Sequence, residues 1–387
     1  MRFISPLMEA GVFSLKLDKK IFLQSGQSPF CITDYITMNF RAMVFFSDIM
    51  YLGEYMLNNI RRQKEEKEKK TLAEAAALSA DTAGRLKQEP DSDIYTSYEI
   101  DRGRIIYSKA FRRLKHKTQV FISPQSDHMH TRLTHTLEVY DIADRIAYAL
   151  NLNRDLTAAI ALGHDLGHAP FGHAGEAALN EFCPPCEHNA QSLRVVDVLE
   201  SGNGLNLRYE VRDGILNHRS ANSPATLEGK VVNFSDKIAY VNHDLDDALG
   251  AGVLTKADFP DEIFRELGEN SRQRIDTMIE DIVLNSMGKN IVVKGEKIGG
   301  ITSRLRDILF EKLYLGSAAK ARQEEKAKGV LKTLFEYFVK HPEEMPEEYI
   351  IRGEEDMPRS VCDYIAGMTD NYAIEKYEEI FIPHQYL

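Results

Sequence analysis

The stretch that decides the fold is residues 131–178, TRLTHTLEVYDIADRIAYALNLNRDLTAAIALGHDLGHAPFGHAGEAA. His135 shares a spacing of i, i+4, i+7 and i+11 with three aliphatic residues, Val139, Ile142 and Ile146. This spacing is typical of the inward face of an amphipathic helix. The pattern therefore predicts a helix that carries His135 into the protein interior.

A second helix is predicted directly after the first. Asn153 or Asp155 can cap its start, and Gly167 can end it. His164 falls on its apolar face, and Asp165 follows. A lone inward histidine is more often a satisfied core residue than a ligand. Two of them in one helical bundle, with an aspartate beside the second, favour a metal site.

A third predicted helix supplies a further carboxylate. In residues 229–252, GKVVNFSDKIAYVNHDLDDALGAG, three polar residues stand four apart on one stripe, namely Asp236, Tyr240 and Asp244. A buried carboxylate must be paired or bind a metal, so this stripe indicates a cavity. The alternative is an exposed helix with an acidic tail.

The composition is that of an ordinary globular protein, with 43% hydrophobic and 28% charged residues among 387. The net charge of −11 argues against general binding to nucleic acid or to anionic membranes, because both need a basic surface. Nucleic-acid binding at a local basic cluster stays open. Ten of the 12 histidines lie within residues 116–243, which again favours a site there.

The cysteine count and the N-terminus bear on location. Four cysteines are too few for a disulfide scaffold and suit a reducing cytosol, so a cytoplasmic protein is expected. The first 20 residues contain no secretory signal pattern. Residues 42–57 are apolar but too short for a membrane helix, so no membrane association is expected. They are either a core helix or upstream sequence translated from an early start codon.

Composition and periodicity divide the chain into four predicted segments: an N-terminal extension (1–57), a charged linker whose helix stops at Pro90 (58–94), a helical core with a metal-binding motif in 131–244 (95–250), and a helical C-terminal region (251–387). Within the last segment, a short strand pair at Ile291–Ile298 is an additional prediction.

A basic run precedes the central stretch. It places seven cations in 16 residues with no acid among them: Arg102, Arg104, Lys109, Arg112, Arg113, Lys115 and Lys117. Phosphate binding explains this bias, because arginine forks and lysine ammonium groups match phosphate oxygens. The alternative is a solvated helix face whose cations pair with acids elsewhere.

Seven sequence blocks, in order, resemble the HD phosphohydrolase superfamily and, more narrowly, bacterial deoxyguanosinetriphosphate triphosphohydrolase-like proteins. They are SKAFRRLKHKTQVF (108–121), TRLTHTLEV (131–139), ALGHDLGHAPFGHAGE (161–176), EHNAQSLRVVDVLE (187–200), VRDGILNHRS (211–220), SDKIAYVNHDLDDA (235–248) and VCDYIAGMTDNYA (361–373). The resemblance begins near residue 97 and implies an all-α fold, with an HD-domain helical core and an α-helical C-terminal extension.

The resemblance implies a metal centre and catalytic groups. The order His135, His164, Asp165, Asp236 is similar to the H…HD…D signature, so these four residues are the expected metal ligands. Two imidazoles and two carboxylates suit Mn²⁺ or Mg²⁺, with Fe²⁺ or Zn²⁺ as alternatives. The family's catalytic histidine, its acidic partner and a second phosphate-side histidine correspond to His173, Glu176 and His188. His168 supports them or is purely structural. Glu187 and Ala190 depart from the family pattern next to His188.

The resemblance also implies a substrate and partners. The substrate is a deoxynucleoside triphosphate, dGTP or several dNTPs, cut at the α-phosphorus to deoxynucleoside and inorganic triphosphate. The expected substrate contacts are Arg132 and Lys237 to the triphosphate, Tyr240 and Asp244 to the sugar, and Gln119 to the sugar edge. A homo-oligomer and an allosteric nucleotide are further expectations. Tyr364 and Asp370 either close the cavity or serve helix packing.

Two other functions fit the same residues. An HD phosphohydrolase could cleave another phosphoester, such as a nucleoside monophosphate, a cyclic dinucleotide or an alarmone. A nucleotide-sensing regulator could keep the fold without the chemistry. The seven ordered blocks favour the triphosphate substrate, and an intact His173 argues against a sensor, which needs no proton donor.

Overall fold

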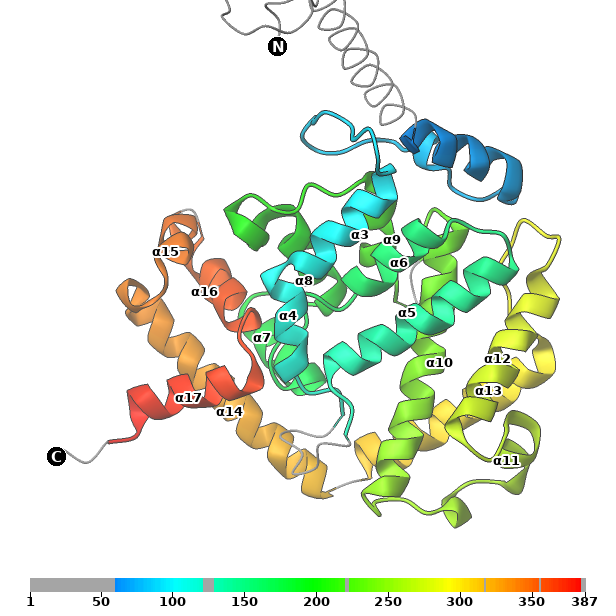
Figure 1. Ribbon diagram of the computed structural model, residues 1–387. Coiled ribbons are helices and arrows are strands. Elements are labelled where there is room, and N and C mark those ends of the chain that lie inside the picture. Colours follow the sequence, from blue (N-terminus) through cyan, green and yellow to red (C-terminus); the bar gives the residue numbers. More distant parts are fainter. Residues whose placement is uncertain (1–59, 121–128, 220–222, 317, 355, 384–387) are drawn as a thin grey trace, which may run out of the picture. The chain divides into compact units, whose positions relative to one another are not determined.

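In the computed structural model, the two helices predicted around His135 and His164 are α5 (Arg132–Ala149) and α6 (Arg154–Gly163). Asn153 caps α6, because its side-chain oxygen accepts hydrogen bonds from the backbone N–H groups of Asp155 and Leu156, each 3.1 Å away. The aliphatic face of α5 is buried together with His135, as predicted. The two helices pack against each other (Figure 1).

The structure describes residues 60–383, apart from residues 121–128, 220–222, 317 and 355. Within these ranges the protein is all-α, and β structure is limited to two isolated bridges. None of the helices described has both the length and the apolar character that a membrane crossing requires. The predicted N-terminal extension, residues 1–57, lies outside the described residues.

The third predicted helix is α10 (Leu227–Gly250), which packs against α5, α6 and α9 (Tyr209–Leu216). Thr226 caps α10 by accepting a hydrogen bond from the backbone N–H of Gly229 at 3.1 Å. A first hydrophobic core lies between these helices and includes Val139, Ile160 and Leu245, all fully buried. Figure 1 shows α10 crossing next to α5. The inward stripe of α10 therefore reaches the histidines of α5 and α6.

The C-terminal region is helical, as predicted. Its helices are α11 (Asp261–Leu267), α12 (Ser271–Ser286), α13 (Glu296–Leu309), α14 (Ala318–Lys340), α15 (Glu347–Gly353), α16 (Met357–Ala366) and α17 (Asp370–Phe381). A second hydrophobic core joins α14, α16 and α17 to α7 (Gly172–Phe182). The helix that carries His173 and Glu176, α7, is thus held in place by packing against the C-terminal helices.

Two local predictions were wrong. The strand pair at Ile291–Ile298 is an irregular segment that leads into α13 at Glu296. The predicted linker helix covers only residues 60–71 of the described chain and does not run on to Pro90. It stops there because Glu68 accepts hydrogen bonds from the backbone and hydroxyl of Ser79, both at 2.8 Å, which turns the chain onto the core.

Candidate metal centre and active site

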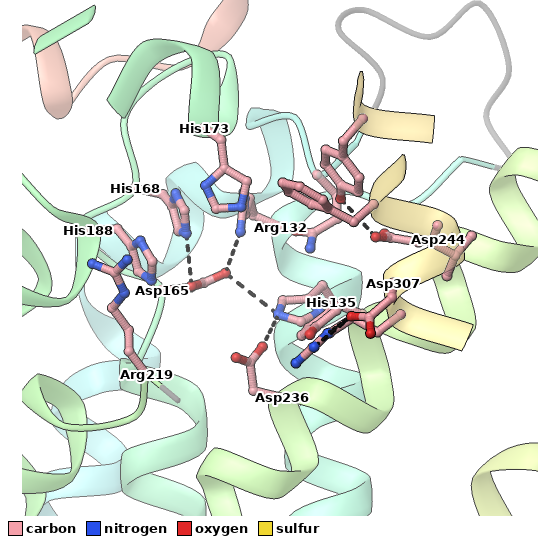
Figure 2. A pocket seen from close by; sticks show the side chains of 16 residues that line it. Arg132, His135, Asp165, His168, His173, His188, Arg219, Asp236, Asp244 and Asp307 are labelled. Carbon is pink, nitrogen blue, oxygen red and sulfur yellow. Dashed lines mark hydrogen bonds and ion pairs between the residues drawn. The ribbon is translucent and has the colours of Figure 1, made fainter. Parts of the chain in front are cut away.

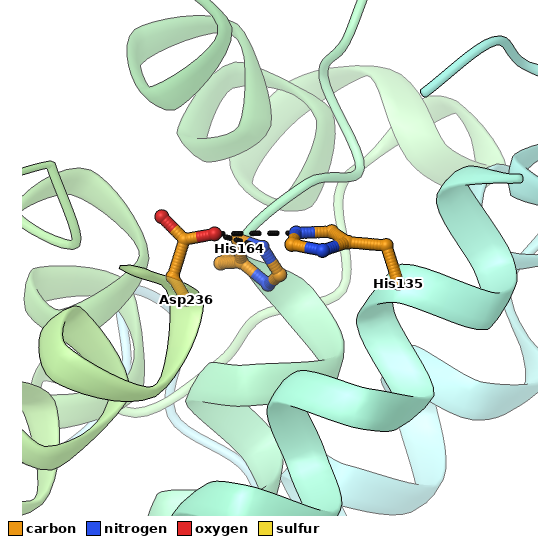
Figure 3. A group of neighbouring side chains, drawn as sticks. All are labelled: His135, His164 and Asp236. Atoms are coloured by element: carbon orange, nitrogen blue, oxygen red, sulfur yellow. Dashed lines mark ion pairs between the residues drawn. The ribbon is translucent and has the colours of Figure 1, made fainter. Parts of the chain in front are cut away.

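Three predicted ligands converge from three helices. The ligand atoms of His135, His164 and Asp236 all lie within 4.8 Å of one another (Figure 3). Asp236 Oδ1 is 3.2 Å from His135 Nε2 and 3.9 Å from His164 Nε2. Burial opposes ionisation of Asp236, but the hydrogen bond from His135 and the neighbouring histidines hold the pKa of its carboxyl below the usual range.

The fourth predicted ligand, Asp165, lies beside the same two histidines. Its Oδ1 is 3.4 Å from His164 Nε2, and its Oδ2 is 3.7 Å from His135 Nε2. The carboxylate also receives a hydrogen bond from Arg132 Nη1 at 3.0 Å and lies 3.2 Å from His168 Nε2. Figure 2 shows Asp165 between His135, Arg132 and His168.

The residues present fit a divalent metal. His164 Nδ1 is 2.7 Å from the carbonyl oxygen of Ala161, which can only accept, so this nitrogen carries the proton and Nε2 offers its lone pair. His164 Nε2 is buried and has no hydrogen-bond partner in the described part of the chain. Imidazole nitrogens and carboxylate oxygens suit Mn²⁺, Fe²⁺ or Zn²⁺, so His135, His164, Asp165 and Asp236 can hold such an ion.

Glu176 joins the two predicted catalytic histidines. Its Oε2 is 3.3 Å from His173 Nδ1 and 3.1 Å from His188 Nδ1, and Oε1 accepts the backbone N–H of His188 at 3.0 Å. Burial raises the pKa of Glu176, but the hydrogen bonds from the two histidines outweigh it and hold this pKa far below the usual range. Glu176 is therefore a fixed anion between two imidazoles.

Hydrogen bonds join the turn at His164 to α8 (His188–Arg194). The Ser192 hydroxyl donates to the carbonyl of His164 at 2.7 Å and accepts from the Gly167 N–H at 2.8 Å. A Cβ on Gly167 would lie 2.1 Å from the backbone nitrogen of Ser192, so only glycine allows this approach. Gly167 does not end α6 as predicted, because that helix stops at Gly163, but it permits the contact that positions Asp165 and His168.

These groups face one cavity of about 590 Å³ (Figure 2). Its lining, within the described residues, is Gln119, Arg132, His135, Asp165, His168, His173, His188, Arg219, Asp236, Tyr240, Asp244, Arg306, Asp307, Leu309, Phe310 and Tyr314. Arg132 Nη2 is buried and has no hydrogen-bond partner among the described residues, and Arg132 is otherwise held by Thr118 and Asp165. A fixed guanidinium with a free N–H suits an anionic ligand.

The predicted substrate contacts are mostly brought to this cavity. Gln119, Arg132, Tyr240 and Asp244 line it, whereas Lys237 does not. The Lys237 ammonium instead donates to Asn233 Oδ1 at 2.8 Å, and burial lowers its pKa to about 8.

The basic run is absent from the cavity lining. Arg102 pairs with Asp155, and Arg104 pairs with Glu89. These two cations therefore follow the alternative interpretation of the run, in which its cations pair with acids elsewhere in the chain. Lys117 is buried and donates to backbone carbonyls, one of them that of Ala366 at 2.8 Å. The cations that face the cavity are Arg132, Arg219 and Arg306.

Tyr364 and Asp370 serve packing, because neither lines the cavity. Asp370 is buried and accepts hydrogen bonds from the backbone N–H groups of Thr118 at 3.0 Å and Phe171 at 2.9 Å. Phe171 has a left-handed backbone, with φ of 65°, directly before α7. Asp370 therefore fixes the segments on which Gln119 and His173 stand.

One wall of the cavity was missed from sequence. It comes from α13 and the π-helical turn η6 (Phe310–Leu315), and its residues are Arg306, Asp307, Leu309, Phe310 and Tyr314. The Tyr314 hydroxyl donates to Asp244 Oδ2 at 2.7 Å. Arg219 was also missed, although it follows His218 inside one of the seven blocks. Helical periodicity in 303–316 was the only signal for this wall, and periodicity does not show which element a helix will face.

Comparisons with known proteins agree with this arrangement. The HD domain family matches residues 132–241, the segment that holds all four predicted metal ligands. The phosphohydrolase-associated domain family matches residues 296–379, which include the missed wall and Asp370.

Curated relatives extend the similarity to most of the chain. A deoxyguanosinetriphosphate triphosphohydrolase-like protein of Caldanaerobacter subterraneus subsp. tengcongensis is 56% identical over 330 residues, which cover 84% of this chain and 96% of that protein. Proteins of the same description from Clostridium perfringens and Clostridium tetani are 46% and 44% identical, over 84% of this chain and 98% and 97% of theirs. The chain therefore belongs to the deoxyguanosinetriphosphate triphosphohydrolase-like family of HD-domain proteins.

Proposed function

We propose that this protein hydrolyses deoxynucleoside triphosphates at the α-phosphorus, releasing deoxynucleoside and inorganic triphosphate. The observation that carries the proposal is a single cavity in which the His135–His164–Asp236 cluster, the Glu176-linked histidines and three arginines meet. A cation site beside the fixed guanidinium of Arg132 suits a polyphosphate, because both neutralise its charge. The names of the curated relatives support the same substrate class.

The residues divide the work as follows. His135, His164, Asp165 and Asp236 would hold a divalent ion, which when bound polarises a phosphoryl oxygen. Arg132, with its free Nη2, and the two further arginines of the cavity hold the triphosphate. Lys237, predicted for the same role, stands outside the lining and contributes only if it turns away from Asn233.

Proton transfer falls to His173. Water adds to the α-phosphorus, the bond between phosphorus and the sugar O5′ breaks, and O5′ takes a proton. His173 Nδ1 faces Glu176 at 3.3 Å, so the carboxylate orients the ring and leaves Nε2 as the nitrogen that delivers the proton to O5′. The imidazole is 62% exposed, which leaves it free to meet a ligand in the cavity.

Tyr240 and Asp244 give the site its sugar preference. Asp244 Oδ1 is buried in the cavity wall and lies 3.0 Å from His243 Nδ1, while Oδ2 accepts from Tyr314. A carboxylate in this position can accept a hydrogen bond from a hydroxyl such as the sugar 3′-OH. With Tyr240 beside it, the wall leaves little room for a 2′-hydroxyl, so deoxynucleotides are preferred.

Product analysis tests the proposal. Purified protein is incubated with each deoxynucleoside triphosphate and its ribonucleotide counterpart, with Mn²⁺ or Mg²⁺, and the phosphate products are resolved. Intact triphosphate plus deoxynucleoside is expected, and the panel then ranks the bases. Orthophosphate or pyrophosphate as the only product would contradict the position of the cut. No turnover of any nucleotide would favour another phosphoester or a nucleotide sensor.

The variant His173→Ala separates enzyme from sensor. The expected result is a loss of turnover of about 100-fold or more with nucleotide binding retained, because a positioned acid contributes that order of rate. Equal turnover by His173→Ala and wild type would remove His173 from the mechanism.

A further inference from the structure

Each arginine of the cavity lining is paired with a carboxylate. The three pairs are Arg132–Asp165 at 3.0 Å, Arg306–Asp307 at 2.6 Å and Arg219–Glu187 at 2.9 Å. An arginine grips a phosphate best with both arms of its guanidinium fork, so an arginine that already binds a carboxylate has to exchange partners. The three pairs differ in how readily the carboxylate can leave.

Two of the pairs keep their negative charge at the cavity. Asp165 is 3% exposed and also lies 3.2 Å from His168 Nε2, so its withdrawal from Arg132 would leave a buried charge without its cation. Asp307 is exposed, but it lines the cavity together with Arg306. Its carboxylate therefore stays beside a bound phosphate even when it releases the guanidinium.

Glu187 is placed differently. Its side chain is 50% exposed, and it does not belong to the cavity lining within the described residues. It precedes α8 but makes no capping hydrogen bond to that helix through its side chain. The Glu187 carboxylate can therefore turn into solvent at small cost, because an exposed ion pair contributes little. Its departure also takes a negative charge away from the cavity.

The backbone of Arg219 is fixed while its side chain reaches the cavity. Asn233 of α10 is 1% exposed, and its Nδ2 donates to the carbonyl oxygens of His218 and Arg219, both at 2.8 Å. Figure 2 shows Arg219 among the cavity side chains, on the side of His188. An exchange of partners by Arg219 thus needs a side-chain rotation and no movement of the backbone.

We infer that Glu187 is the resting partner of Arg219 and that the phosphate chain of a bound nucleotide takes its place. The inference rests on the proposed polyphosphate substrate. A ligand already bound to Arg132 meets Arg219 at a high effective concentration, so it competes with Glu187 better than a free anion does. Glu187 touches no reacting atom and acts through Arg219. It is therefore a positioning residue that sets the affinity of the site for its phosphate chain.

Binding of inorganic tripolyphosphate tests the exchange without any need for turnover. The full chain, with Mg²⁺ in fixed excess, is titrated with tripolyphosphate in a calorimeter at low ionic strength. Glu187→Gln should bind tripolyphosphate up to about fivefold more tightly than wild type, because the ligand no longer displaces an exposed carboxylate. The KM for the nucleotide should fall by the same factor with kcat unchanged.

A double-mutant cycle separates the ion pair from the general effect of a removed charge. Arg219→Gln should weaken binding, and Glu187→Gln should add nothing in the Arg219→Gln background. Glu187→Ala repeats the comparison without an amide oxygen that can still accept from Arg219. Glu343→Gln is the matched control, because it removes the same charge from an exposed acid of η7 (Pro342–Glu344) that pairs with His341, and it should bind as wild type does.

The outcomes distinguish this inference from the proposed function. Wild-type affinity in both Glu187→Gln and Glu187→Ala would overturn the exchange. An equal gain with and without Arg219 would overturn it too, as a general charge effect, and continued cutting of deoxynucleotides would leave the proposed function standing in either case. A gain that requires Arg219, in a protein that cuts no nucleotide, would support the exchange and overturn the triphosphohydrolase activity.

Discussion

His135 Nδ1 lies 2.9 Å from His243 Nε2, so the predicted metal ligand is held from behind by a second imidazole. Because His135 Nε2 faces Asp236 and His164, Nδ1 is the nitrogen that donates to His243. His243 in turn stacks on His130, with ring centroids 5.0 Å apart. Burial lowers the pKa of His130, but hydrogen bonds to Asp247 and Glu138 outweigh it and raise this pKa to about 10. His135 thus meets the ring of His243 edge-on, at the end of a row of three imidazoles.

Removing the His243 acceptor should weaken metal binding. His243→Ala leaves the N–H of His135 without its partner, and loss of such an outer contact costs about 10- to 100-fold in metal affinity. His243→Gln is the matched control, since its amide oxygen can take the place of Nε2. Affinity for Mn²⁺ is measured by competition with a chelator. Equal affinities for His243→Ala and His243→Gln would show that the contact does not orient His135.

Two glycine substitutions should act in opposite directions. Gly167→Ala drives a Cβ into the backbone of Ser192 and should cost about 3 kcal/mol or more in unfolding free energy. Gly103→Ala lies inside α3 (Ser97–Tyr107) with no atom within 4 Å of the new Cβ, and should add up to about 1 kcal/mol. Denaturant unfolding measures both. A neutral Gly167→Ala would mean that the turn can move away from α8.

Stability should fall as pH rises through the titration of Glu228. Burial raises the pKa of Glu228 to about 7 from 4.5, although its carboxylate accepts the N–H groups of Ala77 and Asn153 at 3.0 Å. The folded protein therefore binds this proton more tightly than the unfolded chain, and folding loses free energy between pH 4.5 and 7.

Glu228→Gln has no proton to lose. Its unfolding free energy relative to wild type should therefore rise by up to about 3 kcal/mol across that pH window and stay level above it. Urea unfolding at several pH values, for both proteins, gives the difference. Parallel pH curves would contradict the raised pKa.

Tyr314 and Asp244 should be energetically coupled. The Tyr314 hydroxyl donates to a carboxylate that is 1% exposed, so Tyr314→Phe should lower the unfolding free energy by about 1–3 kcal/mol. A double-mutant cycle with Asp244→Asn isolates the pair. A coupling energy near zero would mean that η6 is held at the cavity by its apolar contacts alone.

Local periodicity explains how much could be predicted. The inward positions of His135, His164 and Asp236 could each be predicted from the apolar periodicity around them. Their side chains meet because these apolar faces pack against one another. The α13–η6 wall could not be predicted, because Tyr314 and Asp244 are 70 residues apart and no local pattern links them. The end of the linker helix before residue 72 could not be predicted for the same reason. Glu68 and Glu228 accept hydrogen bonds from the backbone N–H groups of Ser79 and Ala77, and no local pattern announces these contacts.

The hydrogen bonds of Asp370 have a consequence for biosynthesis. This residue opens α17 (Asp370–Phe381), yet it fixes Thr118 and Phe171, which flank the cavity far earlier in the chain. A ribosome that has translated the whole HD domain has therefore not yet produced the residue that locks these two segments. A nascent chain that lacks α17 should therefore hold every metal ligand while the segments of Thr118 and Phe171 still lack their shared acceptor.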